Sequence, residues 1–130
     1  MTEQDIIASF GIVVRYFDGD LMPDELGFYD KTTRTAFLSD RLSEKEKVKV
    51  LLHELGHENH SISEYHFARI KCENEADRNM VHHLVKDAIQ QLDDIKDFNY
   101  LHFMEYYNLT TTTAEIMVKE EFYGILEEYL

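Results

Sequence analysis

The residues His53-Glu54-Leu55-Gly56-His57 have the types and spacing that bind a metal ion and activate water. Residues i and i+4 of a helix lie one turn apart, so both imidazoles can reach one ion. Glu54 follows the first histidine, which places its carboxylate beside that ion, where it can take a proton from a water. The pattern predicts a catalytic zinc site with His53 and His57 as ligands and Glu54 as the base.

The same pattern can arise by chance in a chain with seven histidines. The surrounding residues favour the zinc site, because they predict a helix there. Ser43 and Glu46 have capping-box spacing at its start. Apolar residues then follow at i, i+3, i+4 and i+7, namely Val48, Leu51, Leu52 and Leu55. At about 100° per residue, these apolar side chains lie roughly opposite the two histidines.

Gly56 falls within this motif, and glycine inside a helix costs about 1 kcal/mol relative to alanine. Either the helix simply tolerates this cost, or another backbone approaches the active-site helix closely at this point. The sequence leaves both explanations open.

A catalytic zinc site uses three protein ligands, so the third must come from another segment. The candidates are Glu73, Glu75, His60 and His66. Glu73 is favoured because it shares a helix face with Asp77, in line with an apolar stripe that runs through Met80. A carboxylate directed toward a core is costly unless it is paired or binds metal. Asp77 is then placed to accept the free N–H of a histidine ligand, and Glu75 is expected to be solvated.

The competing explanation for Glu73 and Asp77 is an exposed first helical turn, where the helix dipole also favours acids. Tyr65 or His66 is a candidate to stabilise an oxyanion, since both lie between the two metal-binding segments. Cys72 is expected to be an ordinary buried thiol, although zinc also accepts thiolate. Packing or surface roles are expected for the remaining histidines: His60, His66, His82, His83 and His102.

The elements that must position these residues indicate an α+β fold. Strands are expected at 12–17, 26–29 and 35–38, with a loop at 18–25 and a turn at 30–34. They suggest a small antiparallel sheet packed on the active-site helix. Other helices are expected at 2–10, 72–98, 100–107 and after residue 113. The last is expected to bury Ile116, Phe122, Ile125 and Leu126. We expect one domain over residues 1–130, with a core at 1–98 and a C-terminal helical part at 99–130.

The composition narrows the classes of partner. The formal net charge is −13, and Lys45, Lys47 and Lys49 alternate with acids, so direct binding of nucleic acid is not expected. The acidic surface serves solubility or attracts a basic protein. No apolar run is long enough to span a membrane. Residues 1–7 do not look like a secretory signal, and Cys72 has no cysteine to pair with, so a cytoplasmic location is expected.

In these motifs the chain resembles the ImmA/IrrE family of metallopeptidases, which is typical of bacteria, prophages and mobile elements. The resemblance rests on His53 to His57, on Glu73-Asn74-Glu75-Ala76-Asp77, and on the sheet-forming segment 26–39 before them. It covers roughly residues 1–98. The chain departs from the family pattern in two ways. Residues 79–85 replace an apolar continuation that often ends in Met-Pro in the family. No helix-turn-helix domain precedes the peptidase core.

The resemblance implies a zincin-like metallopeptidase domain with Zn²⁺ at His53, His57 and Glu73, and Glu54 as general base. It also implies a substrate, because relatives cleave helix-turn-helix repressors and so induce silenced phage or mobile-element genes. Here the repressor would be a separate chain in the bacterial host cell. The alternatives are a catalytically silent binding module that captures a repressor without cleaving it, and a scaffold with a structural zinc site. Mn or Fe remains open as the working metal.

Overall fold

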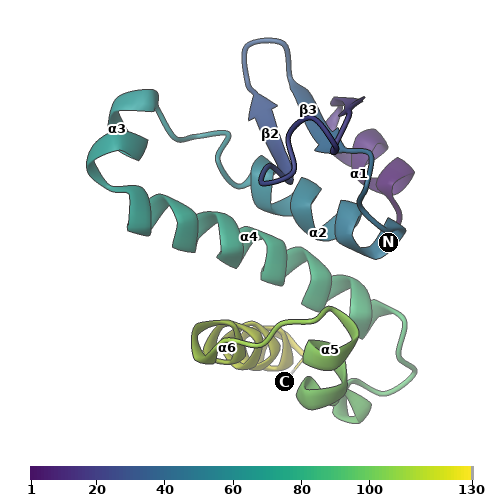
Figure 1. The fold of residues 1–130 in the computed structure, drawn as a ribbon. Helices are drawn as coiled ribbons and strands as arrows, with labels where there is room; N and C mark the ends of the chain where they lie inside the picture. Colours follow the sequence, from purple (N-terminus) through teal and green to yellow (C-terminus); the bar gives the residue numbers. More distant parts are fainter. Residues whose placement is uncertain (130) are drawn as a thin grey trace. The chain divides into compact units, whose positions relative to one another are not determined.

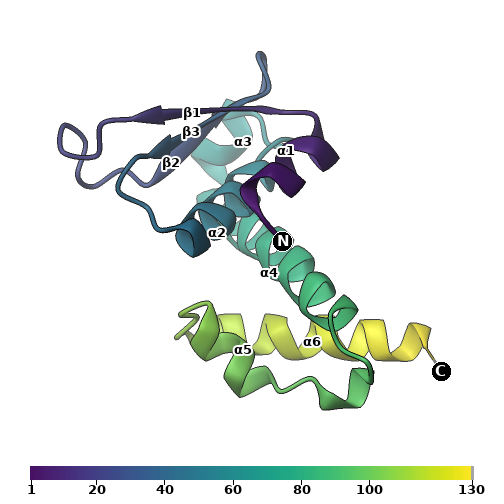
Figure 2. The same cartoon turned by 90° about the vertical axis from the view of Figure 1, so that its right-hand side faces the viewer.

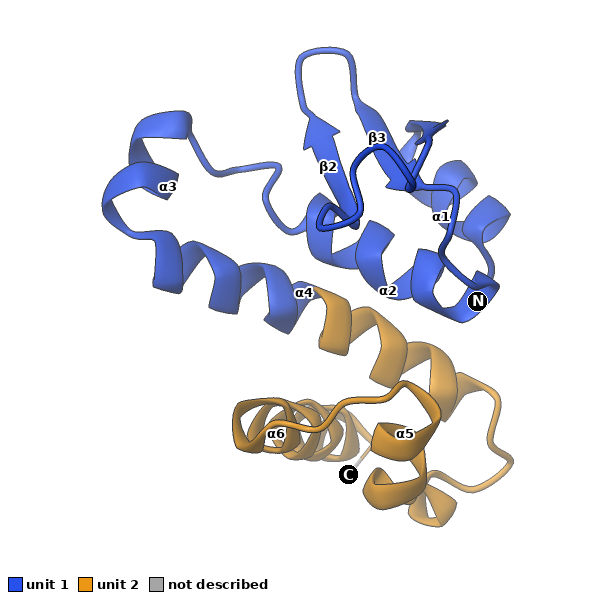
Figure 3. Ribbon diagram, viewed as in Figure 1, with its two compact units in different colours: residues 1–79 blue, residues 80–130 orange. Residues whose placement is uncertain are grey.

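The computed structural model describes residues 1–129 and divides into two compact units. The first comprises Met1–Asn79 and the second begins at Met80, so the boundary falls within a long helix (Figure 3). Every residue proposed from the sequence for the metal site lies in the first unit. The single-domain boundaries expected from the sequence stay a prediction.

The first unit is an α+β structure, as the sequence predicts, with a three-stranded sheet (Figure 1). Its strands are β1 (Val13–Phe17), β2 (Gly27–Asp30) and β3 (Thr35–Ser39), in the order β1-β3-β2. β2 pairs antiparallel with β3, but β1 pairs parallel with β3, so the expectation of a purely antiparallel sheet is wrong. The physical reason is the long connection between β1 and β2, which carries the chain past one strand position to the far edge of the sheet.

Helices α1 (Glu3–Phe10) and α2 (Glu44–Leu55) lie on the same side of this sheet (Figure 2). Ala36 and Leu38 alternate on β3, and both are fully buried, as are Leu51 and Leu52 on α2. The capping box of α2 is confirmed, because the Ser43 hydroxyl accepts from the Glu46 N–H while the Glu46 carboxylate accepts from the Ser43 N–H, both at 3.2 Å. The leucines of α2 therefore anchor the motif-bearing helix to the sheet.

The helix expected at 72–98 is α4, which spans Arg69–Gln90. It ends early because Asp93 and Asp94 follow, and Asp94 instead caps a 3₁₀ turn at Ile95–Asp97 by accepting from the Lys96 N–H. The last part of the expected helix, residues 91–98, is therefore wrong, and Leu92 within it is exposed. A short helix, α3 (Ile62–Phe67), precedes α4 and was not expected.

The second unit contains the end of α4, then α5 (Tyr100–Tyr106) and α6 (Thr112–Glu128). Phe98 connects the last two helices, with its ring 5.6 Å from that of Phe103 and 4.8 Å from that of Phe122. On α6 the buried residues are Met117 and Val118. Ile116 is half exposed, which corrects its expected burial, and Phe122, Ile125 and Leu126 are partly buried. Among residues 1–129, no helix is long and apolar enough to cross a membrane.

Candidate metal centre

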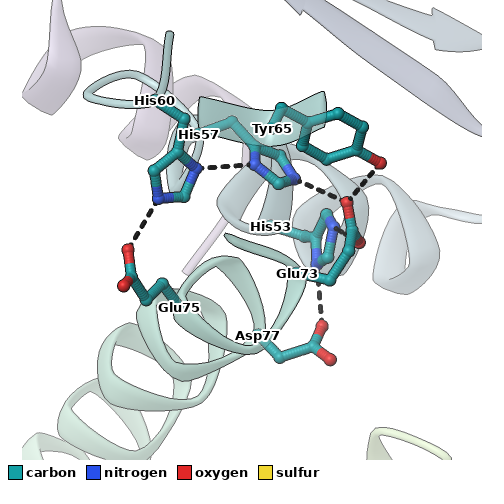
Figure 4. A network of polar contacts seen from close by, with 7 residues as sticks. All are labelled: His53, His57, His60, Tyr65, Glu73, Glu75 and Asp77. Atoms are coloured by element: carbon teal, nitrogen blue, oxygen red, sulfur yellow. Dashed lines mark hydrogen bonds and ion pairs between the residues drawn. The ribbon is translucent and has the colours of Figure 1, made fainter. Parts of the chain in front are cut away.

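His53 of α2, His57 in the turn that follows this helix, and Glu73 of α4 converge in the first unit (Figure 4), so the sequence expectation that both histidines lie on one helix is wrong for His57. Nε2 of His53 lies 3.1 Å from Oε2 of Glu73, and Nε2 of His57 lies 3.1 Å from Oε1 of the same carboxylate. Three ligands at about 2.0–2.1 Å from a tetrahedral zinc ion are separated from one another by about 3.3 Å. The donor types and their spacing therefore fit Zn²⁺.

The convergence depends on close contact between α4 and the end of α2. A Cβ built on Gly56 would stand 2.6 Å from Cα of Ala76, so only glycine permits this approach. Of the two explanations that the sequence leaves open for Gly56, the structure supports the close approach of another backbone. Nδ2 of Asn79 also donates to the carbonyl of Leu52 at 2.8 Å, which ties the two helices together one turn away.

Asp77 is placed to orient the first histidine. Its Oδ1 lies 2.7 Å from Nδ1 of His53, which leaves Nε2 directed at Glu73. Burial disfavours the charged form of His53, but the hydrogen bond and charge of Asp77 outweigh burial, with help from Glu54 and Glu73, and the pKa of His53 is raised. The Asp77 contact is the second-sphere arrangement common around histidine ligands.

Glu54 follows His53 on α2 and is partly buried. Burial raises the pKa of the Glu54 carboxyl to about 7, against the charge of His53, and the negative charge of Glu73 adds to the rise. A carboxyl group with a pKa near neutral is suited to both accept and return a proton. The sequence expectation of a general base at this position is compatible with that environment.

His57 contacts His60, a histidine for which the sequence predicts a packing or surface role. Nδ1 of His57 lies 2.9 Å from Nδ1 of His60, and Nε2 of His60 lies 2.7 Å from Oε2 of Glu75. Glu75, expected to be solvated, is half exposed but takes part in this network. Burial lowers the pKa of His57, and the neighbouring His53 and His60 add to the effect against the charge of Glu73.

Tyr65 is the one oxyanion candidate that the structure brings to the site. Its hydroxyl donates to Oε1 of Glu73 at 2.9 Å, and its ring meets that of His57 edge-on. His66 is exposed and contacts the ring of Phe67 instead. Cys72 is fully buried, as expected, and lies with His60 and Glu64 in a second group of side chains able to bind metal.

The histidines of the second unit do not belong to this centre. His82 Nδ1 lies 2.8 Å from Oε2 of Glu121, which joins α4 to α6. The ring of His83 meets that of His82 edge-on, and His102 is exposed on α5. The expectation of packing or surface roles holds for these three.

Residues 7–119 match the family model of peptidase M78, described as the IrrE N-terminal-like domain. The chain belongs to this family. The match confirms the ImmA/IrrE resemblance and extends beyond residue 98, so the peptidase M78 domain includes α5 and part of α6. Membership identifies a metallopeptidase-like domain, and within its first unit His53, His57 and Glu73 form a group of side chains that could hold a metal ion. A search of curated proteins found no significant match.

Proposed function

We propose that this protein is a zinc-dependent endopeptidase. The observation that carries the proposal is the convergence of His53 Nε2, His57 Nε2 and the Glu73 carboxylate, with Glu54 following His53 on α2 and influenced by the charges of His53 and Glu73. A zinc ion held by these three residues would supply a Lewis acid that polarises a carbonyl group and lowers the pKa of water. The identity of the metal is part of the proposal.

The chain's own residues supply the proton transfers. Glu54 takes a proton from the attacking water and passes it to the amide nitrogen that leaves, so it acts first as general base and then as general acid. Its raised pKa, about 7, suits both transfers. Asp77 holds the ring of His53, and the Tyr65 hydroxyl is close enough to donate to an oxygen that develops negative charge near Glu73.

For the substrate, we propose a helix-turn-helix repressor of a phage or mobile element, cleaved to induce gene expression. The family membership and the net charge of −13 support this choice. A repressor has a basic face for DNA, and an acidic protein is attracted to such a face.

The test is cleavage of the repressor encoded beside this gene, with the wild type and Glu54→Gln compared. The glutamine variant keeps the size and polarity of the side chain but cannot take a proton, so we expect cleavage by the wild type alone. If both proteins capture the repressor intact, the chain is a binding module and the peptidase proposal is wrong.

A further inference from the structure

The proposed zinc ligand His57 is held on its outer side by a second histidine. Nδ1 of His57 lies 2.9 Å from Nδ1 of His60, whose Nε2 lies 2.7 Å from Oε2 of Glu75 (Figure 4). His60 is 8% exposed, so water has little access to compete for its ring nitrogens. The three side chains form one continuous chain of hydrogen bonds that ends on α4.

The positions of the protons along these hydrogen bonds follow from the metal site at one end and the Glu75 carboxylate at the other. If Nε2 of His57 faces the metal, the neutral ring carries its proton on Nδ1 and donates it to His60. Nδ1 of His60 must then be the acceptor, so the proton of His60 lies on Nε2. That N–H points at the Glu75 carboxylate, which can only accept when ionised. A proton on Nδ1 of His60 would instead set two N–H groups against each other.

We propose that His60 and Glu75 are positioning residues that fix the tautomer and ring orientation of His57 for metal binding. The inference rests on the zinc site of the proposed function. It gives both histidine ligands an outer partner: Asp77 acts directly on His53, and Glu75 acts on His57 through His60. Partners of this kind raise the basicity of a ligand and reduce the freedom that metal binding must remove.

The β2–β3 hairpin holds the turn that carries His60. Nζ of Lys31 donates to the His60 carbonyl at 2.9 Å, and the Tyr29 hydroxyl donates to Glu58 at 3.3 Å. Arg34 also forms an ion pair with Glu58. These contacts fix the backbone between His57 and His60, so the imidazole of His60 is held in place before metal binds.

Another use of His60 is conceivable, since it also lies near Glu64 and Cys72 in a group of side chains able to bind metal. Both ring nitrogens of His60 already have partners, in His57 and Glu75. An ion bound by His60 and Cys72 would have to replace one of those hydrogen bonds. The geometry therefore favours the positioning role over a second metal site.

Long-range ¹H–¹⁵N spectra of the zinc-loaded full chain read the tautomers directly. We expect His60 with its proton on Nε2 and His57 with its proton on Nδ1. A proton on Nδ1 of His60, or loss of the single tautomer at His57 in the wild type, overturns the proposal.

Zinc affinity, measured by competition with a chelator, tests the energetic consequence. His60→Leu and Glu75→Leu each remove an acceptor, so we expect zinc to bind about 10–100-fold more weakly. His60→Asn and Glu75→Gln each retain an acceptor and should restore most of the affinity. Lys71→Met is the matched control, because Lys71 forms an exposed ion pair with Glu75 at 3.7 Å but does not contact His60.

The outcomes separate this inference from the peptidase proposal. Wild-type affinity in Glu75→Leu, or equal loss in Lys71→Met, overturns the positioning role while repressor cleavage by the wild type stands. Two zinc ions per chain, one of them lost in Cys72→Ser, would make His60 a ligand and also overturn it. Absence of cleavage with zinc still bound would reject the peptidase proposal alone, since none of these readouts measures cleavage.

Discussion

Gly56, directly after α2, and Ala76, on α4, bring the ends of the two helices together: a Cβ at position 56 would stand 2.6 Å from Cα of Ala76 and 3.1 Å from its carbonyl oxygen. Both neighbouring atoms belong to the backbone, so neither can move aside by a change of rotamer. Gly56 lies between Leu55, the last residue of the motif's helix, and His57, while Ala76 lies between Glu73 and Asp77. This contact therefore constrains the separation of the proposed ligands His57 and Glu73.

Gly56→Ala should destabilise the protein by about 1–3 kcal/mol, because the added methyl group forces the two backbones apart. The same shift should weaken zinc binding. Denaturant unfolding and chelator competition measure the two effects. Gly124→Ala is the matched control, since nothing lies within 4 Å of a Cβ built there and alanine favours a helix. Equal stability of Gly56→Ala and the wild type would show that the contact does not constrain the helices.

Removing each glutamate of α4 should separate ligand from positioning residue. Glu73 faces Nε2 of both histidines, whereas Glu75 contacts His60. Glu73→Ala should therefore weaken zinc binding much more than Glu75→Ala, as chelator competition would show. A larger loss in Glu75→Ala would mean that the ligand has been assigned to the wrong carboxylate.

Substitution of Asp77 tests how the first histidine is oriented. Asp77→Asn keeps an oxygen that can accept from Nδ1 of His53, while Asp77→Leu removes it. We expect Asp77→Leu to weaken zinc binding by about 10–100-fold and Asp77→Asn to have a smaller effect. Titration calorimetry with zinc measures both. Identical affinities for Asp77→Leu and the wild type would leave Asp77 with no role at the site.

The sequence predicts the motif's helix well because its signals are local: a capping box and apolar residues at helical spacing. Helical phase is also enough to expect Glu73 and Asp77 on one face, and in the structure they lie 3.1 and 2.7 Å from His53. Helical phase does not predict the contact that Glu75 makes, because its partner His60 lies outside any helix. The spacing of three residues between His57 and His60 is a weak signal for that turn.

Two features of the fold could not be derived in the same way. The parallel pairing of β1 with β3 depends on the path of the connecting loop, which strand periodicity does not describe. Helix α3 does have a local signal, because Ser61 caps it by accepting from the Glu64 N–H at 2.9 Å and the two residues have capping-box spacing. Its short length hides the apolar periodicity that usually accompanies such a cap.

Association with the repressor should depend on salt if the acidic surface guides docking. The net charge of −13 attracts a basic face over a distance that salt limits to about 8 Å at physiological ionic strength. We expect the association rate to fall markedly across a salt series, with excess DNA competing for the repressor. Stopped-flow mixing or a biosensor measures this rate. A rate that barely changes would indicate docking through an apolar patch and reject electrostatic steering.

Metal analysis of the purified protein tests the central claim most directly. The convergence of His53, His57 and Glu73 predicts about one zinc per chain, since three protein ligands form one catalytic site. His53→Ala and His57→Ala should both lose the ion, while His102→Ala, an exposed histidine of the second unit, should retain it. Equal zinc content in all four proteins would contradict the assignment of the site.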